Sequence, residues 1–216
     1  MTEDGFSISK FSIRGWVAVA LIMLSAGMLF WELAVGIQLE EGFAWDVDLM
    51  LTLESLHRPW LDSLFKAITH TAGALVVVPI TMTVIYLWRR SEKITAAVVV
   101  TSFLASLIVG QLFKIQFERP RPDVFTPLVV EHTASFPSGH TLAAVSFYGL
   151  LSILLWERGH RLLSVISGIW VFLIALSRVY LGAHYPSDVL ASLALGTIML
   201  FITLFTYKRL TAQARS

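Results

Sequence analysis

Three short stretches beside apolar segments carry ionisable side chains whose types suit the binding of an anion. The first stretch runs from Lys114 to Pro122 and includes Arg121. Pro120 and Pro122 are expected to end a helix, because proline lacks a donor and biases its predecessor toward extended backbone. Arg121 would then fold back toward Lys114, and two neighbouring cations form a receptor for a dianion. The alternative is a pair of anchors at a membrane edge that reach toward the headgroups.

The second stretch is Pro137-Ser138-Gly139-His140, placed where a new apolar segment begins. Proline is tolerated in a first helical turn, and that turn has free N–H groups at the positive end of the helix dipole. Gly139 allows close backbone approach and Ser138 adds a hydroxyl, so the turn is a candidate anion cradle with His140 above it. The alternative is a simple helix N-cap with a hydrogen-bonded histidine.

The third stretch, residues 177–188, contains Arg178, His184, Pro186 and Asp188. Pro186 fits the first turn of a helix, and His184 and Asp188 are spaced to face each other across that turn. A carboxylate bonded to one ring nitrogen fixes the histidine tautomer and leaves the other nitrogen a free lone pair. This arrangement is typical of a histidine nucleophile, and Arg178 adds a further guanidinium.

Together the three stretches supply cations, anion-cradling amides, a nucleophile with its orienting acid and a second histidine. Glu118 and Arg119, which lie between motif positions, are predicted to be solvated loop residues. The predicted catalytic residues are His184, His140 and Asp188, and the predicted anion-binding residues are Lys114, Arg121, Ser138, Gly139 and Arg178.

The elements that position these residues are predicted to be membrane spans. Of the 216 residues 56% are hydrophobic and 14% are charged, which places the chain outside the usual range of soluble domains. Apolar runs recur at about the 20 residues that a bilayer requires. The sequence therefore predicts an all-α, single-domain bundle over residues 1–216, with spans at about 15–37, 67–88, 94–113, 138–156, 162–180 and 187–207.

The basic residues predict the orientation of the bundle. With six spans and the N-terminus inside, ten of the 16 Lys and Arg residues fall on the inner side. The positive-inside rule then places both termini in the cytoplasm and all three polar stretches at the extracytoplasmic face. The net charge of +1 argues against a nucleic-acid partner, and the absence of cysteine excludes thiolate chemistry.

Two outer connections in this arrangement are long. Residues 38–66 contain Trp45 and Trp60 among acidic and apolar residues, so they form either a helix lying in the membrane interface or an ordinary packed loop. Residues 115–137 contain four of the seven prolines. Pro79 is predicted to kink the second span.

The pattern Lys-x6-Arg-Pro, Pro-Ser-Gly-His and Ser-Arg-x5-His-x3-Asp is complete and in order, and it resembles the type 2 phosphatidic acid phosphatase (PAP2) superfamily. The resemblance implies a metal-independent hydrolase without cofactor, in the cell membrane, that removes phosphate from a lipid through a phosphohistidine. In this family pattern His184 attacks phosphorus, Asp188 orients it and His140 protonates the leaving oxygen. The small size resembles bacterial members that act on phosphatidylglycerophosphate or undecaprenyl diphosphate, with phosphatidate also possible.

Because His184 must be neutral and His140 cationic, a bell-shaped pH–rate profile is expected. Two other functions remain open on the sequence. One is a phosphotransferase that uses the same site with an alcohol acceptor. The other is a lipid or anion transporter with a phosphate-binding site, although paired discontinuous helices of the transporter kind are not evident in the sequence.

Overall fold

The predicted all-α class is confirmed. The structure is a computed structural model that describes residues 13–39 and 42–214, and no strand occurs in those two ranges. Lys10 and Arg215, two of the inner cations, lie outside them. The helices are α1 Ile13–Gln38, α2 Ala44–Glu54, α3 Pro59–His70, α4 Val77–Arg89, α5 Lys93–Phe117, α6 Gly139–Ala144, α7 Leu150–Glu157, α8 Arg161–Tyr180 and α9 Pro186–Gln213.

Five helical segments are long and apolar enough to cross a membrane. They match five of the predicted spans to within a few residues at most of their ends, and the fourth combines α6, the π-helical turn η3 (Val145–Gly149) and α7. The segments are Gly15–Gln38, Lys93–Phe117, Gly139–Glu157, Arg161–Tyr180 and Pro186–Gln213.

The second predicted span, 67–88, is broken into two helical parts and counts as a sixth span only if the bent pair crosses the membrane as one. The chain forms α3 and then α4, with a 3₁₀ turn (η2, Ala74–Val76) between them, and the two helical parts meet at a bend of 51°. At the break the Thr71 carbonyl accepts a bond from Tyr148 Oη at 3.0 Å, and Thr71 Oγ1 accepts one from Trp170 Nε1 at 2.9 Å. A bend in this span was predicted, but its position at Pro79 is wrong, because the bend lies at residues 71–73. Pro79 lies in the first turn of α4, where proline is tolerated.

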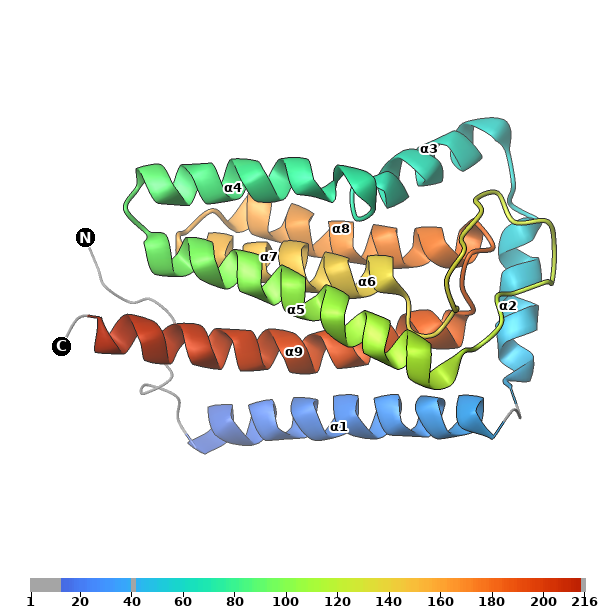
Figure 1. Ribbon diagram of the computed structural model, residues 1–216, viewed down its shortest axis with the longest axis horizontal. Helices are drawn as coiled ribbons and strands as arrows, with labels where there is room; N and C mark the ends of the chain where they lie inside the picture. Colours follow the sequence, from blue (N-terminus) through green and yellow to red (C-terminus); the bar gives the residue numbers. More distant parts are fainter. Residues whose placement is uncertain (1–12, 40–41, 215–216) are drawn as a thin grey trace.

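The spans form a bundle whose two ends differ (Figure 1). α1 begins and α9 finishes at one end, together with the α4–α5 and α7–α8 turns. At the opposite end α2 lies across the bundle, beside the 118–138 loop and the α8–α9 turn. Much of the long outer connection is helical, over residues 44–54 and 59–70. This agrees with the interpretation of residues 38–66 as helical and not as an ordinary loop. Their position in a membrane interface remains a prediction.

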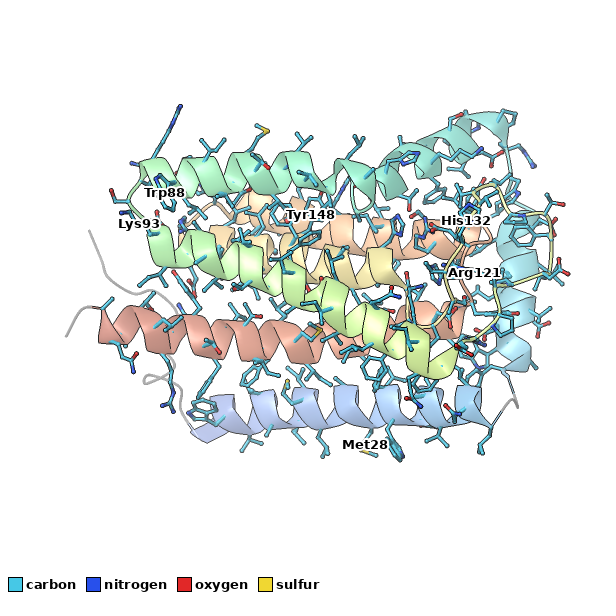
Figure 2. The ribbon with its side chains drawn as sticks, viewed as in Figure 1. Met28, Trp88, Lys93, Arg121, His132 and Tyr148 are labelled. Atoms are coloured by element: carbon cyan, nitrogen blue, oxygen red, sulfur yellow. The ribbon has the colours of Figure 1, made fainter. Side chains whose placement is uncertain are left out.

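The helical segments that follow the two predicted histidines, η3 and α9, pack closely in the bundle. A Cβ on Gly196 of α9 would lie 2.9 Å from Val145 Cβ of η3, so only glycine allows this approach. α1 packs against α9, and Met28 points away from the bundle on its outer side (Figure 2). Exposed apolar side chains such as Met28, 63% exposed, are typical of a surface that contacts lipid.

Candidate active site

Lys114 and Arg121 converge on one short stretch of the long outer loop. Lys114 lies in the last turn of α5, and Glu118 leaves the helix in the left-handed conformation with φ of 44°. The chain then turns back, so that Lys114 Nζ donates to Thr133 Oγ1 at 3.2 Å and Arg121 Nε donates to the Thr133 carbonyl at 2.8 Å. The predicted approach of Arg121 to Lys114 is confirmed, although the helix ends before Pro120 and not at it.

His184 and Asp188 face each other at the start of α9, as the spacing predicted. His184 Nδ1 lies 3.6 Å from Asp188 Oδ2, and both side chains are buried. Ser135, which lies outside the three motif stretches and was not predicted, is beside this pair. Its Oγ donates to Asp188 Oδ2 at 2.5 Å and lies 3.4 Å from His184 Nδ1.

The contact between Arg121 and His184 selects the tautomer of the histidine. Arg121 Nη1 lies 3.1 Å from His184 Nε2. A guanidinium can only donate, so Nε2 must accept and carries no proton. The proton of a neutral His184 then lies on Nδ1, the nitrogen that faces Asp188. This places the unprotonated lone pair on Nε2, where it accepts from Arg121.

The surroundings of His184 also favour its neutral form. Burial lowers the pKa of His184 well below its ordinary value, and the positive charges of Arg178, Arg121 and Lys114 lower it further. A neutral imidazole is the form that can act as a nucleophile.

Arg178 reaches the site from the last turn of α8. Its side chain is 1% exposed, and it donates to Thr69 Oγ1 at 2.7 Å and to Glu131 Oε1. Burial raises the pKa of Glu131, but Arg178, Arg121 and His184 outweigh it, so the pKa stays below its ordinary value. The ionised Glu131 carboxylate also lies 4.0 Å from His140 Nδ1. Glu131 had no signal in the sequence, because it belongs to none of the three motif stretches.

The Ser138-Gly139-His140 stretch begins a helix as predicted, after a cis Phe136–Pro137 peptide bond. Ser138 is the N-cap, and its buried Oγ accepts a bond from the Thr141 N–H at 3.4 Å. A Cβ on Gly139 would lie 4.0 Å from Lys114 Cε, so this turn lies beside the first cation. The structure thus brings all eight predicted residues to the end of the bundle that carries α2.

Gly73, in the break between α3 and α4, sets the space available to His140. A Cβ at residue 73 would lie 2.8 Å from His140 Nε2. Gly73→Ala is therefore expected to displace His140 and to lower kcat by about 100-fold, the scale of a 1 Å misplacement in a site. Steady-state kinetics on a lipid phosphate measures this. Gly27→Ala is the control, because its Cβ would meet nothing within 4 Å. A wild-type kcat for Gly73→Ala would contradict the prediction.

Arg119 was predicted to be a solvated loop residue, and this is wrong. Its side chain is 10% exposed and pairs with two carboxylates, Asp188 and Asp46. Asp46 lies on α2, which is far from the motifs in sequence, so no spacing rule connects it to them. Glu118, the other residue of that prediction, is exposed.

Comparison with known proteins agrees with this geometry. A sequence model of the PAP2 superfamily matches residues 95–212. Phosphatidylglycerophosphatase B of Bacillus subtilis is 29% identical over 156 residues, which cover 68% of this chain and 75% of the relative. The putative undecaprenyl-diphosphatase YbjG of Escherichia coli is 36% identical over 150 residues, 65% of this chain and 70% of the relative.

The fold is also found among solved structures. The crystal structure of the transmembrane PAP2-type phosphatidylglycerolphosphate phosphatase from Bacillus subtilis superposes with a TM-score of 0.77 at 27% identity, and the match covers 85% of this chain and 94% of that one. The family match, the relatives and the fold agree. The chain therefore belongs to the PAP2 superfamily, as an enzyme of its lipid phosphatase group.

Proposed function

We propose that this protein is a metal-independent membrane lipid phosphatase that hydrolyses a lipid phosphomonoester or diphosphate through a phosphohistidine at His184. One observation carries the proposal. His184 Nε2 accepts from Arg121 Nη1 at 3.1 Å, while Nδ1 faces the carboxylate of Asp188 at 3.6 Å. The lone pair of a neutral imidazole thus lies where the guanidinium would bind a phosphoryl oxygen.

In the first step the Nε2 lone pair attacks phosphorus, and the bond from phosphorus to the lipid-side oxygen breaks. His140 gives its proton to that oxygen. The Nδ1 proton stays with His184, and Asp188 stabilises the positive charge that develops on the ring. In the second step water attacks phosphorus, His140 takes a proton from the water, and the bond from phosphorus to Nε2 breaks, which returns the lone pair to His184 and releases phosphate.

Positive charge around the phosphoryl group contributes most of the transition-state stabilisation in such a reaction. Here Lys114, Arg121 and Arg178 supply it, with the Ser138 hydroxyl and the Gly139 N–H as further donors. These groups take the place of the divalent cation that other phosphatases use, so activity should persist without metal.

The proposed location is the cell membrane, with six spans if the bent α3–α4 pair is one of them. The end of the bundle opposite the site carries most of the inner cations, among them Arg89, Arg90, Lys93, Arg158 and Arg161. Figure 2 shows Lys93 at that end and Arg121 at the other. The positive-inside rule then directs the site away from the cytoplasm.

The proposed substrates are phosphatidylglycerophosphate and undecaprenyl diphosphate, with phosphatidate next. The first two are supported by the names of the relatives, phosphatidylglycerophosphatase B and undecaprenyl-diphosphatase. All three carry a terminal phosphate on a lipid, which is what the cation cluster would bind.

The test is a phosphate-release assay on purified protein in detergent with excess EDTA, using these three lipids and comparing kcat/KM. We expect release from at least one of them, and a 32P adduct on the enzyme that is labile in acid and maps to the peptide containing His184. No release from any of them, or release only without EDTA, would overturn the proposal. Transfer of the label to an added alcohol would identify a phosphotransferase.

A further inference from the structure

Arg119 joins two buried carboxylates that come from different helices. Its Nη1 donates to Asp188 Oδ1 at 2.5 Å, and its Nη2 donates to Asp46 Oδ2 at 3.1 Å. Asp46 and Asp188 are 1% and 0% exposed. A guanidinium that bridges two buried carboxylates fixes the direction of both, because its five donors lie in one rigid plane.

The first of these carboxylates belongs to the proposed catalytic pair. Asp188 Oδ2 accepts bonds from Ser135 Oγ at 2.5 Å and from the Tyr185 N–H at 3.0 Å, and it faces His184. The other oxygen, Oδ1, accepts from Arg119 Nη1. Arg119 therefore helps to prevent the Asp188 carboxylate from rotating, because it holds the Oδ1 atom.

The second carboxylate ties α2 to the same turn. Asp46 Oδ1 accepts from the Ser187 N–H at 2.8 Å, and Asp46 Oδ2 accepts from Ser187 Oγ at 2.6 Å. Ser187 lies in the first turn of α9, whose N–H groups have no partner within the helix. Asp46 thus caps α9 from outside, and α2 lies across this end of the bundle (Figure 1).

The Arg119 side chain is itself held in place. Its Cζ lies 4.1 Å from the centre of the Tyr185 ring, and Nη1 also donates to Ser187 Oγ at 2.8 Å. The guanidinium is thus packed between the ring and the two carboxylates. Lysine in this position could supply one point charge but could not reproduce the fork.

We propose that Arg119 and Asp46 are positioning residues, which act through Asp188 to orient the nucleophile and which make the docking of α2 a requirement for full activity. The inference rests on the proposed function, since it presupposes that His184 is the nucleophile. Arg119 and Asp46 do not touch the reacting phosphate in this scheme. Their effect therefore falls on kcat more than on KM.

The test compares Arg119→Gln, Arg119→Lys and Asp46→Asn with wild type, on a lipid phosphate that wild type hydrolyses. Arg119→Gln is expected to lower kcat by about 100-fold with KM within about twofold, because the carboxylate that orients the histidine loses its direction. Arg119→Lys should recover part of that loss. Asp46→Asn should lower kcat less than Arg119→Gln, because the amide puts a donor against Arg119 or Ser187 but leaves Asp188 its other partners.

The controls are Asp48→Asn and Arg58→Gln, which change exposed residues at the same end of the protein. Both should leave kcat and the melting temperature in detergent at wild-type values. His184→Ala is measured in parallel. If it keeps its activity, the proposed function is wrong, whatever Arg119 does.

A role in folding alone is separated from positioning by a double-mutant cycle. In an Asp188→Asn background, Arg119→Gln should lower kcat little further, because two changes that act through one group are not additive. Full additivity, or a wild-type kcat in the folded fraction of Arg119→Gln, would overturn the inference. If Arg119→Gln does not fold, Arg119→Lys and Asp46→Asn take its place in the test. A wild-type kcat in both of these variants would also overturn the inference.

Discussion

His184→Ala is expected to lower kcat/KM on a lipid phosphate by about 10⁴-fold or more, the scale seen when a nucleophile is removed. The reason is that, among the residues described by the structure, only His184 directs an unprotonated ring nitrogen at the Arg121 guanidinium. Nε2 of His184 faces the Arg121 guanidinium, whereas His140 lies beside Glu131 and Gly73. The measurement is phosphate release together with 32P labelling, and both should be lost.

The matched control is His160→Ala. His160 is exposed and precedes α8 at the far end of the bundle, so its loss should leave the rate unchanged. The pH profile gives a second check on wild type. Because burial and neighbouring cations lower the pKa of His184, the neutral form persists below pH 6.5, and the acid limb of kcat/KM should lie below that value. Labelling that survives in His184→Ala would place the nucleophile elsewhere.

The sequence predicted five long apolar helices and the contact between His184 and Asp188, for physical reasons that are local. A bilayer imposes apolar length on each span, so Lys93–Phe117 and Arg161–Tyr180 were recognisable from composition alone. His184 and Asp188 are neighbours on one helical turn, so their contact follows from spacing. These predictions needed no knowledge of which helix packs against which.

The features that the sequence did not predict depend on hydrogen bonds between residues that are distant in the chain. The bend after α3 is held by bonds to Thr71 from Tyr148 and Trp170, which lie 77 and 99 residues away. Thr71 itself looks like an ordinary residue in an apolar run, so the run was read as one span. A hydrogen bond of this kind is visible only when the packing of α8 and η3 against the break is known.

Arg119 shows the same limit within the site itself. The residue lies between two motif positions, where a cation in a proline-rich loop is usually solvated. Its partners Asp46 and Asp188 are 73 and 69 residues away. A clue did exist, because the long outer connection placed acidic residues near the site end of the bundle. Only the structure shows that one of them, Asp46, turns inward while Asp48 of the same helix stays exposed.

His140→Gln is expected to have the second largest effect, and the size of that effect should depend on the leaving group. A general acid contributes about 10²- to 10⁴-fold when the leaving oxygen is an alkoxide. His140 is the second histidine of the site, and its Nδ1 lies 4.0 Å from the Glu131 carboxylate. On a phosphomonoester of a lipid alcohol, such as phosphatidate, the variant should therefore lose activity across that range.

A diphosphate lipid offers a different leaving group at the same site. Attack at its terminal phosphorus expels a phosphate oxygen, which is a much weaker base than an alkoxide and needs less protonation. His140→Gln should accordingly lose less kcat on undecaprenyl diphosphate than on phosphatidate, and least on a nitrophenyl phosphate. His184→Ala should fail on all three. Equal losses for His140→Gln on the three substrates would show that His140 binds phosphate and does not protonate the leaving oxygen, because a binding role is indifferent to the group that departs.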